Sequence, residues 1–129
     1  MLTCVAEYKD RGYTFTYMII VTGAAGFIGS RLAHRLNQDQ YNDLVLVDDF
    51  SRRDKRANYS ELNYSELVDR KDFPVWLKLN ENKVQFIFHL GARTDTTEQN
   101  VEIFNELNLN YSKEVWNLCV EYGIALIYA

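Results

Sequence analysis

Three glycines at a regular spacing could bind a ligand through their backbone. Gly23, Gly26 and Gly29 form a Gly-x-x-Gly-x-x-Gly motif that begins directly after the apolar run 17–22. Glycine permits a tight turn, lets the backbone approach a pyrophosphate without an intervening side chain, and lets the next helix pack closely. The free amide groups and the dipole of that helix attract an anion. Such a motif also occurs in purely structural turns, but its place between a strand and a helix favours a dinucleotide site.

Two carboxylates follow the glycines at a distance that suits the same ligand. Asp48 stands about 20 residues after the motif, where a carboxylate can accept hydrogen bonds from the adenosine ribose hydroxyls. Asp48 is the first choice for this role, and the alternative is that Asp48 and Asp49 merely end a strand. An acidic residue here normally favours NAD over NADP. Several basic residues follow at once and could instead pair with the extra phosphate of NADP, unless they form only a solvated loop: Arg52, Arg53, Lys55 and Arg56.

The elements that must position these residues alternate between short apolar runs and amphipathic stretches. Buried strands are predicted at 17–22, 44–47, 84–90 and 124–128, and helices at 27–37, 72–77 and 101–122. Residues 51–60 are polar and basic and are predicted to begin a loop. Gly123 is expected to end the last helix. The pattern predicts an α/β fold, a Rossmann-type doubly wound parallel sheet that stops after about the fifth strand.

Composition excludes several other classes of protein. The net charge is -4 with both signs interspersed, which argues against nucleic acid as a partner. The longest apolar runs are far shorter than the roughly 20 residues of a membrane span, and no metal site is predicted. Cys4 and Cys119 are far apart, which fits a reducing cytoplasm, and Cys119 is expected in the core. His34 is interpreted as a solvated side chain, and His89 as a residue that fills space.

Longer segments identify a family. From Met18 to Ala129, 112 of the 129 residues, the chain resembles the ADP-L-glycero-D-manno-heptose 6-epimerases, which are extended short-chain dehydrogenases. Residues 18–30 are typical of nucleotide-sugar epimerases and dehydratases in general. The segments 89–98 (HLGARTDTTE) and 108–114 (NLNYSKE) are more specific, and Tyr128-Ala129 is similar to the strand that leads into the catalytic serine region.

The resemblance implies a cofactor site built from six segments. Phe27 and Ile28 would line the pyrophosphate turn, and Asp48 and Asp49 would hold the adenosine ribose. Two basic residues, Lys55 and Arg70, would contact the cofactor phosphate. A loop would pass under both riboses, formed by Leu90, Gly91, Ala92, Arg93 and Thr94. Asn108 would brace this loop. Arg70 replaces the usual lysine, and Leu90 and Arg93 also depart from the family pattern. NADP is the favoured cofactor, with NAD as the alternative.

The catalytic residues of this family are not found in the chain. The family oxidises the sugar at C6 by hydride transfer to the nicotinamide, returns the hydride to the other face, and uses a Tyr-x-x-x-Lys motif as acid and base. No tyrosine here has a lysine four positions later; Tyr111, for example, is followed by Val115. We therefore expect residues 18–129 to be an incomplete NAD(P)-binding Rossmann domain, inactive alone, without the substrate domain. Residues 1–17 are expected to be a disordered extension or to follow from a misassigned start.

Three functions are considered. The first is NADP-dependent epimerisation of an ADP-heptose at C6, in lipopolysaccharide core synthesis, by the full-length form, with only cofactor binding left in these residues. The second is another nucleotide-sugar epimerase or dehydratase, and the third is a non-catalytic dinucleotide-binding module. The resemblance also implies a homo-oligomer and a nucleotide-sugar substrate. A strand beginning at Ile124 would lie bare at the sheet edge, where we expect the chain to associate.

Overall fold

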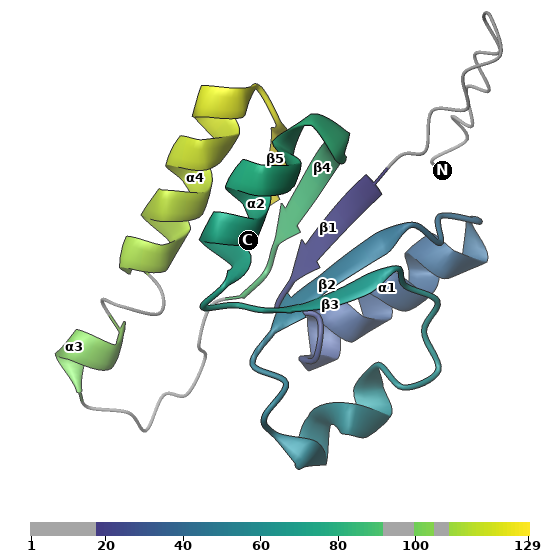
Figure 1. Cartoon of the computed structure of the whole chain (residues 1–129). Helices are drawn as coiled ribbons and strands as arrows, with labels where there is room; N and C mark the ends of the chain where they lie inside the picture. The colour runs from purple at the N-terminus through teal and green to yellow at the C-terminus, as the bar shows by residue number, and fades with distance from the viewer. Residues whose placement is uncertain (1–17, 92–99, 105–108) are drawn as a thin grey trace, which may run out of the picture.

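The computed structural model describes residues 18–91, 100–104 and 109–129, so the expectation for residues 1–17 lies outside it. Helices and strands alternate along these residues as the sequence predicts (Figure 1). In chain order the elements are β1 Met18–Thr22, α1 Phe27–Gln38, β2 Leu44–Asp48, η1 Arg53–Asn58, β3 Glu66–Asp69, α2 Phe73–Asn80, η2 Glu81–Lys83, β4 Val84–His89, α3 Val101–Phe104, α4 Tyr111–Tyr122 and β5 Ala125–Tyr128.

The strands form one parallel sheet in the order β3-β2-β1-β4-β5. The central strand β1 pairs with β2, so that Ile20 lies beside Val45, and with β4, so that Ile20 lies beside Ile87. A parallel sheet whose order reverses beside its first strand is the Rossmann arrangement, in which ligands bind beyond the carboxyl ends of the strands. The predicted fold class is therefore confirmed.

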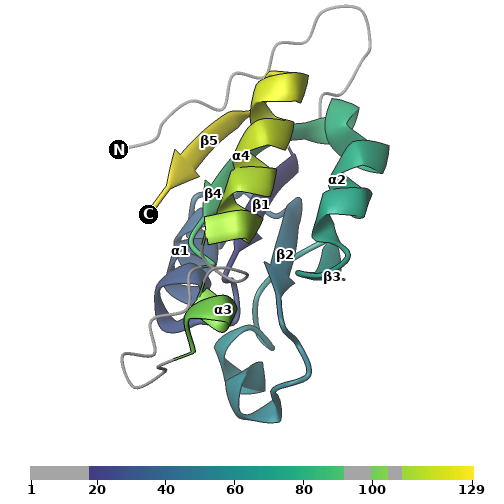
Figure 2. The same ribbon diagram turned by 90° about the vertical axis from the view of Figure 1, so that its left-hand side faces the viewer.

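Helices cover both faces of the sheet, with α1 on one face and α2 and α4 on the other (Figures 1 and 2). Side chains alternate along each strand, so neighbouring residues of β1 enter different cores. Ile20 packs in the core under α2 and α4, whereas Ile19 and Val21 pack in the core under α1. Burial on both faces explains why β1 and β2 read as continuous apolar runs without alternation.

The last helix packs and ends as the sequence predicts. Val115, Leu118 and Cys119 of α4 are buried against the sheet. Gly123 adopts a left-handed conformation with φ 66°, and the next amide, that of Ile124, donates to the Cys119 carbonyl at 2.9 Å. This is the helix end for which glycine is preferred, because other residues are strained at positive φ.

Three stretches of the chain differ from the prediction or extend it. Residues 51–60 are not simply a loop, because they contain the 3-10 helix η1. The strand β3 has no apolar run to announce it, since only Val68 among its four residues is buried. The predicted helix 101–122 is helical at its two ends, as α3 and α4, with a π-helical turn at residues 109 and 110. Residues 105–108 lie outside the described residues.

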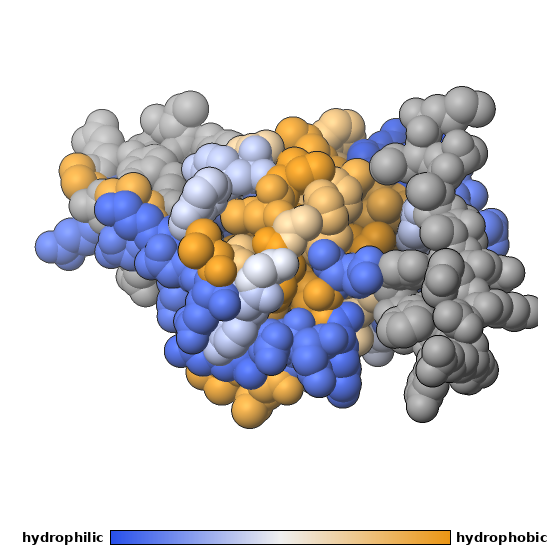
Figure 3. Space-filling model, turned by 90° about the horizontal axis from the view of Figure 1, so that it is seen from above, coloured by the Kyte–Doolittle hydropathy of each residue, from blue (hydrophilic) through white to orange (hydrophobic). Residues whose placement is uncertain are grey.

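The sheet ends in two exposed edge strands. Ile127 and Tyr128 of β5 are about half exposed, and within the described residues β5 pairs with β4 alone. Figure 3 shows hydrophobic residues gathered in the middle of the face that lies at the top of Figure 1, where α2 and α4 end. Leu79 of α2 and Val120 of α4 are among the exposed large apolar side chains. Of the described helices, none has the length and apolarity to cross a membrane.

Candidate functional site

The glycine turn joins β1 to α1 at the carboxyl edge of the sheet. Gly23 has φ +69°, and a Cβ built there would lie 2.7 Å from the carbonyl oxygen of Leu90 in the neighbouring connection. Both the backbone conformation and the close approach therefore require glycine at this position. The turn closes with a hydrogen bond from the Gly26 amide to the Gly23 carbonyl at 3.0 Å.

The other two glycines serve packing and access. A Cβ on Gly29 would lie 2.1 Å from the Gly23 carbonyl oxygen, so α1 can begin this close to the turn only with glycine there. Gly26 precedes the first residue of α1, and no side chain caps the helix at this point in the described structure. Phe27 and Ile28 begin the helix with their side chains 77% and 70% exposed. The helix start is thus sterically open, which is compatible with the predicted anionic ligand.

Asp48 connects the end of β2 to the glycine turn. Its Oδ2 accepts a hydrogen bond from the Ala25 amide at 2.9 Å, and its Oδ1 accepts one from the Asp49 amide at 2.7 Å. A carboxylate offers about four lone-pair sites, so both oxygens retain capacity for a further donor such as a ribose hydroxyl. The structure therefore holds the predicted ribose carboxylate in a fixed orientation beside the predicted pyrophosphate turn.

Asp49 is directed to a different task from Asp48. Its Oδ1 accepts hydrogen bonds from the Ser51 hydroxyl at 2.6 Å and from the Ser51 amide at 3.1 Å. The hydrogen bond from the Ser51 hydroxyl is the main cause that lowers the pKa of Asp49 below its usual range. Of the two predicted ribose residues, Asp48 is therefore the one that the structure ties to the turn, while Asp49 shapes the loop that follows.

The basic residues after Asp49 are not equivalent. Arg52 forms a bidentate ion pair with Asp54, at 2.7 and 3.2 Å, and is thus engaged locally. Lys55 lies in η1 and is half-buried. Arg70 follows β3, and its amide donates to the Asp48 carbonyl at 3.1 Å. Arg70 lines the same small cavity as Asp48, so the structure brings this pair together but does not place Lys55 in that group.

The predicted loop under the riboses is described only at its start. The Leu90 amide donates to the hydroxyl of Thr22 at 3.1 Å, and a Cβ on Gly91 would lie 3.2 Å from that hydroxyl oxygen. The connection after β4 is thereby held against the glycine turn. The remaining predicted residues of this region lie outside the described residues: Ala92, Arg93, Thr94 and Asn108.

His89 does more than fill space, because it links three elements. Its side chain is buried, with Nδ1 at 2.7 Å from the Thr22 hydroxyl and Nε2 at 2.9 Å from the Ser112 hydroxyl of α4. The Thr22 hydroxyl accepts the Leu90 amide and can still donate its own proton to Nδ1; in that tautomer of His89 the Nε2 proton is donated to Ser112. Burial lowers the pKa of His89 to about 4, which keeps the imidazole neutral in this role.

Sequence reasoning missed Thr22, Ser112 and Tyr111 as residues of this edge. Tyr111 is the first residue of α4 and lines the cavity that Asp48 and Arg70 share. The sequence could have indicated that Thr22 and His89 lie near each other, because each residue ends a strand that was predicted to be part of a parallel sheet. The carboxyl ends of parallel strands lie at one edge of the sheet.

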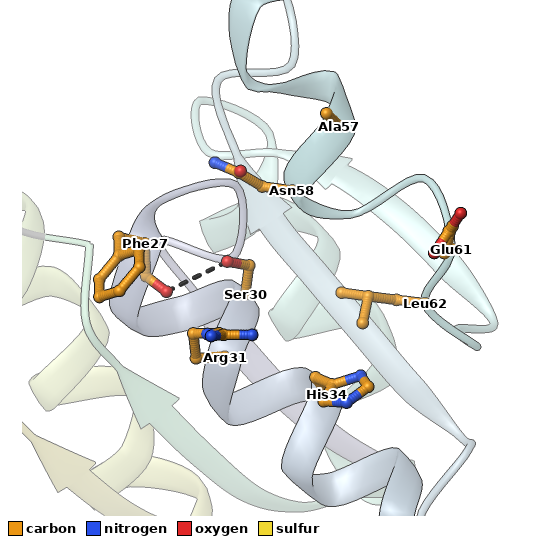
Figure 4. Close-up of a pocket in the computed structure, with 8 residues that line it drawn as sticks. All are labelled: Phe27, Ser30, Arg31, His34, Ala57, Asn58, Glu61 and Leu62. Carbon is orange, nitrogen blue, oxygen red and sulfur yellow. Dashed lines mark hydrogen bonds between the residues drawn. The ribbon is translucent and has the colours of Figure 1, made fainter.

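A larger hollow of about 370 Å³ lies between α1 and the segment around η1 (Figure 4). Arg31 and His34 line it from α1, and His34 is exposed there, in agreement with its interpretation as a solvated side chain. Asn58, on the other wall, donates from Nδ2 to the Ala25 carbonyl of the glycine turn at 2.8 Å. Among the predicted site residues that the structure describes, only Phe27 contributes to this hollow.

The fold and the site together define a dinucleotide-binding Rossmann domain. Its features are a parallel sheet, a turn whose close backbone contacts require glycine, and an acidic residue fixed at the end of β2. Residues 19–129 match the family model described as the NAD dependent epimerase/dehydratase family, and the chain belongs to this family. Two curated relatives are similar over 87% of the chain at 37% identity, the ADP-L-glycero-D-manno-heptose-6-epimerases of Fusobacterium nucleatum and Brachyspira hyodysenteriae. The chain spans 34% and 36% of their lengths.

Solved structures agree with the fold. The ADP-L-glycero-D-manno-heptose-6-epimerase of Helicobacter pylori is similar over 88% of this chain and 39% of its own, with a TM-score of 0.73 and 24% identity. The UDP-glucuronic acid 4-epimerase of Bacillus cereus, solved in complex with NAD, is similar over 86% of this chain and 39% of its own, with a TM-score of 0.71 and 22% identity. At these identities the likeness shows a shared fold.

Proposed function

We propose that the chain binds the adenosine end of a nicotinamide dinucleotide across the glycine turn. The single observation that carries this proposal is the fixed Asp48 carboxylate, which accepts the Ala25 amide of the turn at 2.9 Å and keeps lone pairs for two ribose hydroxyls. The pyrophosphate then lies at the start of α1, where the amide groups and the helix dipole stabilise its charge. Family membership supports the same ligand class.

The residues of the turn fit such a ligand sterically. Gly26 presents no side chain at the start of α1, and a Cβ there would lie 3.2 Å from the Gly23 carbonyl oxygen. The Gly23 and Gly29 contacts fix the turn in one conformation before any ligand arrives. Preorganisation of this kind lowers the entropy that binding must remove.

NADP is our preferred cofactor, on the basis of charge. Arg70 shares a cavity with Asp48, whereas Arg52 is paired with Asp54 and Asp49 is bonded to Ser51. An arginine that lines the same cavity as the proposed ribose carboxylate is suited to a phosphate on the ribose 2′ oxygen, because a guanidinium can pair with phosphate through two parallel hydrogen bonds. Lys55, from η1, is proposed as a second contact to that phosphate.

For the whole protein we propose epimerisation of an ADP-heptose at C6, supported by the two curated relatives at 37% identity. The nicotinamide, when bound, supplies the hydride acceptor and donor. The residues of this chain hold and orient its adenosine end, and because the sequence contains no Tyr-x-x-x-Lys motif, the chain binds the cofactor without turning over the sugar. A nucleotide-sugar substrate and a homo-oligomer belong to this proposal for the whole protein.

Calorimetric titration of the 129-residue chain with NADP and with NAD tests the proposed binding. The Asp48→Asn variant is expected to bind either dinucleotide about tenfold more weakly, because a charge-assisted ribose contact is lost. The matched control is Asp39→Asn, whose carboxylate pairs with Arg35 at the far end of α1 and should leave affinity unchanged. Equal affinities of wild type and Asp48→Asn would contradict the site, and no binding of either dinucleotide by wild type would contradict the proposed function.

The preference for NADP has its own test. Arg70→Gln is expected to weaken NADP about tenfold while leaving NAD within about twofold, because only NADP carries the phosphate that the guanidinium contacts. Lys71→Gln is the neighbouring control, with an exposed side chain that does not line the cavity. An equal loss for both dinucleotides would assign Arg70 to the shared part of the cofactor and remove the basis of the NADP preference.

The substrate proposal requires a protein that contains the residues encoded after Ala129, if the reading frame continues. We expect such a protein to carry Tyr-x-x-x-Lys and to convert an ADP-heptose into its C6 epimer. Nuclear magnetic resonance of the sugar protons would measure this conversion. Conversion of a UDP-sugar but not an ADP-heptose would favour the other epimerases of the family. Cofactor binding without conversion of any nucleotide sugar would favour a binding module.

A further inference from the structure

His89 is a buried polar residue that the proposed binding of the adenosine end does not use. It is the last residue of β4, and only 1% of it is exposed. Burial of an imidazole is unfavourable unless its ring nitrogens find hydrogen-bond partners. The partners that His89 has found in the structure indicate what the residue does.

Both ring nitrogens of His89 are paired with hydroxyl groups of neighbouring elements. Nδ1 lies 2.7 Å from the hydroxyl of Thr22, the last residue of β1, and Nε2 lies 2.9 Å from the hydroxyl of Ser112 in the first turn of α4. A hydroxyl can donate or accept, so either neutral tautomer of the ring satisfies both bonds. The side chain therefore ties the end of β4 to β1 and to α4 at once.

Two tyrosine rings pack against the imidazole. The ring of Tyr128, the last residue of β5, is stacked on it with centroids 5.7 Å apart and planes at 23°. The ring of Tyr111, the first residue of α4, lies with its centroid 5.8 Å away. The His89 carbonyl also accepts the Ala129 amide at 3.2 Å. His89 thus fixes the ends of β1, β4 and β5 and the start of α4 relative to one another.

The hydroxyl of Thr22 passes this support on to the connection after β4. The Leu90 amide donates to it at 3.1 Å, so the same oxygen pairs with His89 Nδ1 and with the first residue of the connection. A Cβ on Gly91 would lie 3.2 Å from that oxygen, which shows how closely the connection passes. The imidazole therefore orients the hydroxyl that holds the start of this connection.

These contacts lie on the side of the glycine turn away from Asp48. Asp48 ends β2, on one side of the central strand β1, whereas β4 and β5 lie on the other side. In a fold of this type a dinucleotide lies across the point where the strand order reverses, with one nucleotide on each side. With the adenosine ribose at Asp48, the nicotinamide nucleotide lies over the ends of β4 and β5.

We propose that His89 is a positioning residue for the nicotinamide half of the cofactor site. Through Thr22 it holds the connection after β4 against the glycine turn, and through Ser112 it holds the start of α4 at the same edge. Its buried side chain acts through these neighbours and not by touching the cofactor. The effect on affinity rests on the proposed function, whereas the effect on the backbone of the connection does not.

Calorimetric titration with two ligands separates the two halves of the site. NADP contains both nucleotides, whereas adenosine 2′,5′-bisphosphate contains only the adenosine half; NAD and adenosine 5′-monophosphate replace this pair if NAD binds more tightly. His89→Leu should weaken NADP about tenfold and leave the bisphosphate within about twofold, because both hydrogen bonds are lost while Asp48 is unchanged. Equal losses for the two ligands, or no loss, would overturn the proposal. So would a wild type that binds NADP no more tightly than the bisphosphate.

A conservative variant tests whether the bond to Thr22 carries the effect. His89→Asn keeps a polar group near the position of Nδ1 and should bind NADP within about threefold of wild type. A loss as large as that of His89→Leu would overturn the role of this bond. The control is Ile87→Val, which shortens a buried side chain two residues earlier on the same face of β4 and should change neither affinity.

Ser112→Ala is the variant that decides the matter if His89→Leu does not fold. It keeps the imidazole and its bond to Thr22 and removes only the bond to α4. NADP should bind about threefold more weakly, and adenosine 2′,5′-bisphosphate should bind as in wild type. Unchanged affinity for NADP, or the same loss for both ligands, would count against the proposal.

Amide hydrogen exchange tests the positioning without any ligand. The Leu90 and Arg70 amides make hydrogen bonds of the same length, 3.1 Å, on the two sides of the sheet edge, to the Thr22 hydroxyl and the Asp48 carbonyl. His89→Leu or Ser112→Ala should speed exchange at Leu90 several-fold and leave Arg70 within about twofold. Equal changes at the two amides, or none, would overturn the inference. If wild type binds no dinucleotide, the proposed function fails, and exchange still decides whether His89 holds the connection.

Discussion

The turn after β1 and the connection after β4 leave neighbouring strands at the same edge of the sheet, but different forces hold them. The turn is fixed by backbone contacts, since a Cβ on Gly29 would lie 2.1 Å from the Gly23 carbonyl oxygen. The β4 connection is fixed by side chains, through the bonds of His89 to Thr22 and Ser112. Steric contacts do not change with protonation, whereas burial makes the charged form of His89 unfavourable and lowers its pKa to about 4. One half of the proposed cofactor site is therefore insensitive to pH and the other half depends on it.

The largest effect should come from adding one methyl group to the turn. Gly29→Ala is expected to destabilise the chain by about 3 kcal/mol or more, because the new Cβ meets backbone atoms that cannot move without opening the turn. Urea unfolding gives the change in free energy of unfolding. Gly123→Ala is the control. Gly123 ends α4 at a positive φ but has no atom within 4 Å of its Cβ position. This variant should therefore cost only the strain of the positive φ, about 1 kcal/mol. Equal losses for the two variants would break the steric account of the turn.

The second effect concerns pH and the β4 connection. His89 has a folded-state pKa of about 4, below the ordinary 6.5 of an unfolded chain, so the unfolded state binds the extra proton between these values. Its contribution to stability is complete above about pH 6.5 and is lost as the pH falls toward 4, by about 2 kcal/mol at pH 4.5. Urea unfolding across this range, compared with His89→Gln, isolates the contribution. A parallel pH dependence in the two proteins would remove the proposed dependence on the neutral imidazole.

A smaller loss is expected at the other end of the histidine network. Ser112→Ala removes the hydroxyl that pairs with Nε2 and leaves a buried ring nitrogen without a partner, which should lower stability by about 1.5 kcal/mol. Ser60→Ala, an exposed serine after η1, is the control and should change stability by less than about 0.5 kcal/mol. A Ser112→Ala variant as stable as wild type would indicate that the start of α4 is not held through His89.

The smallest effect should appear where a side chain supports the turn from outside. Asn58→Ala removes the hydrogen bond from η1 to the Ala25 carbonyl and is expected to lower stability by about 1 kcal/mol. This variant tests whether the turn after β1 depends on side chains, as the connection after β4 does. We expect the turn to keep its conformation through its glycines alone. A loss as large as that of Gly29→Ala would show that the turn also depends on side-chain support.

The same contrast explains what the sequence could predict. The glycine turn and the strand before it follow from residue types at fixed local spacing, and the structure confirms both. The same spacing singled out Asp48, which the structure places against the turn, while its role as a ribose ligand stays a prediction. The partnership of Thr22 with His89 joins residues 67 positions apart and appears only once the strand register is known. Tyr111 was predicted as an apolar position of a helix, because the helical period shows which face a residue lies on but not that it also lines a cavity at the carboxyl edge of the sheet.

Elements with little apolar surface were the hardest to predict. The edge strand β3 buries one side chain of its four, so it lacks both the apolar run of β1 and a clear alternation. The helix η1 buries none of its residues and is held by contacts to the turn and to its own loop. In both cases the conformation is determined by neighbouring elements and leaves only a weak pattern in the local sequence.

The strand order also has a consequence for the time course of synthesis. The central strand β1 can pair at once with β2, but its other neighbour, β4, follows it by 67 residues at the level of Thr22 and His89. At a translation rate of roughly 5–20 residues per second, this delay is roughly 3–13 s. During that interval the nascent chain carries a half-sheet with β1 as an unpaired, apolar edge. A chaperone that shields such an edge should matter most while residues 23–84 are being made.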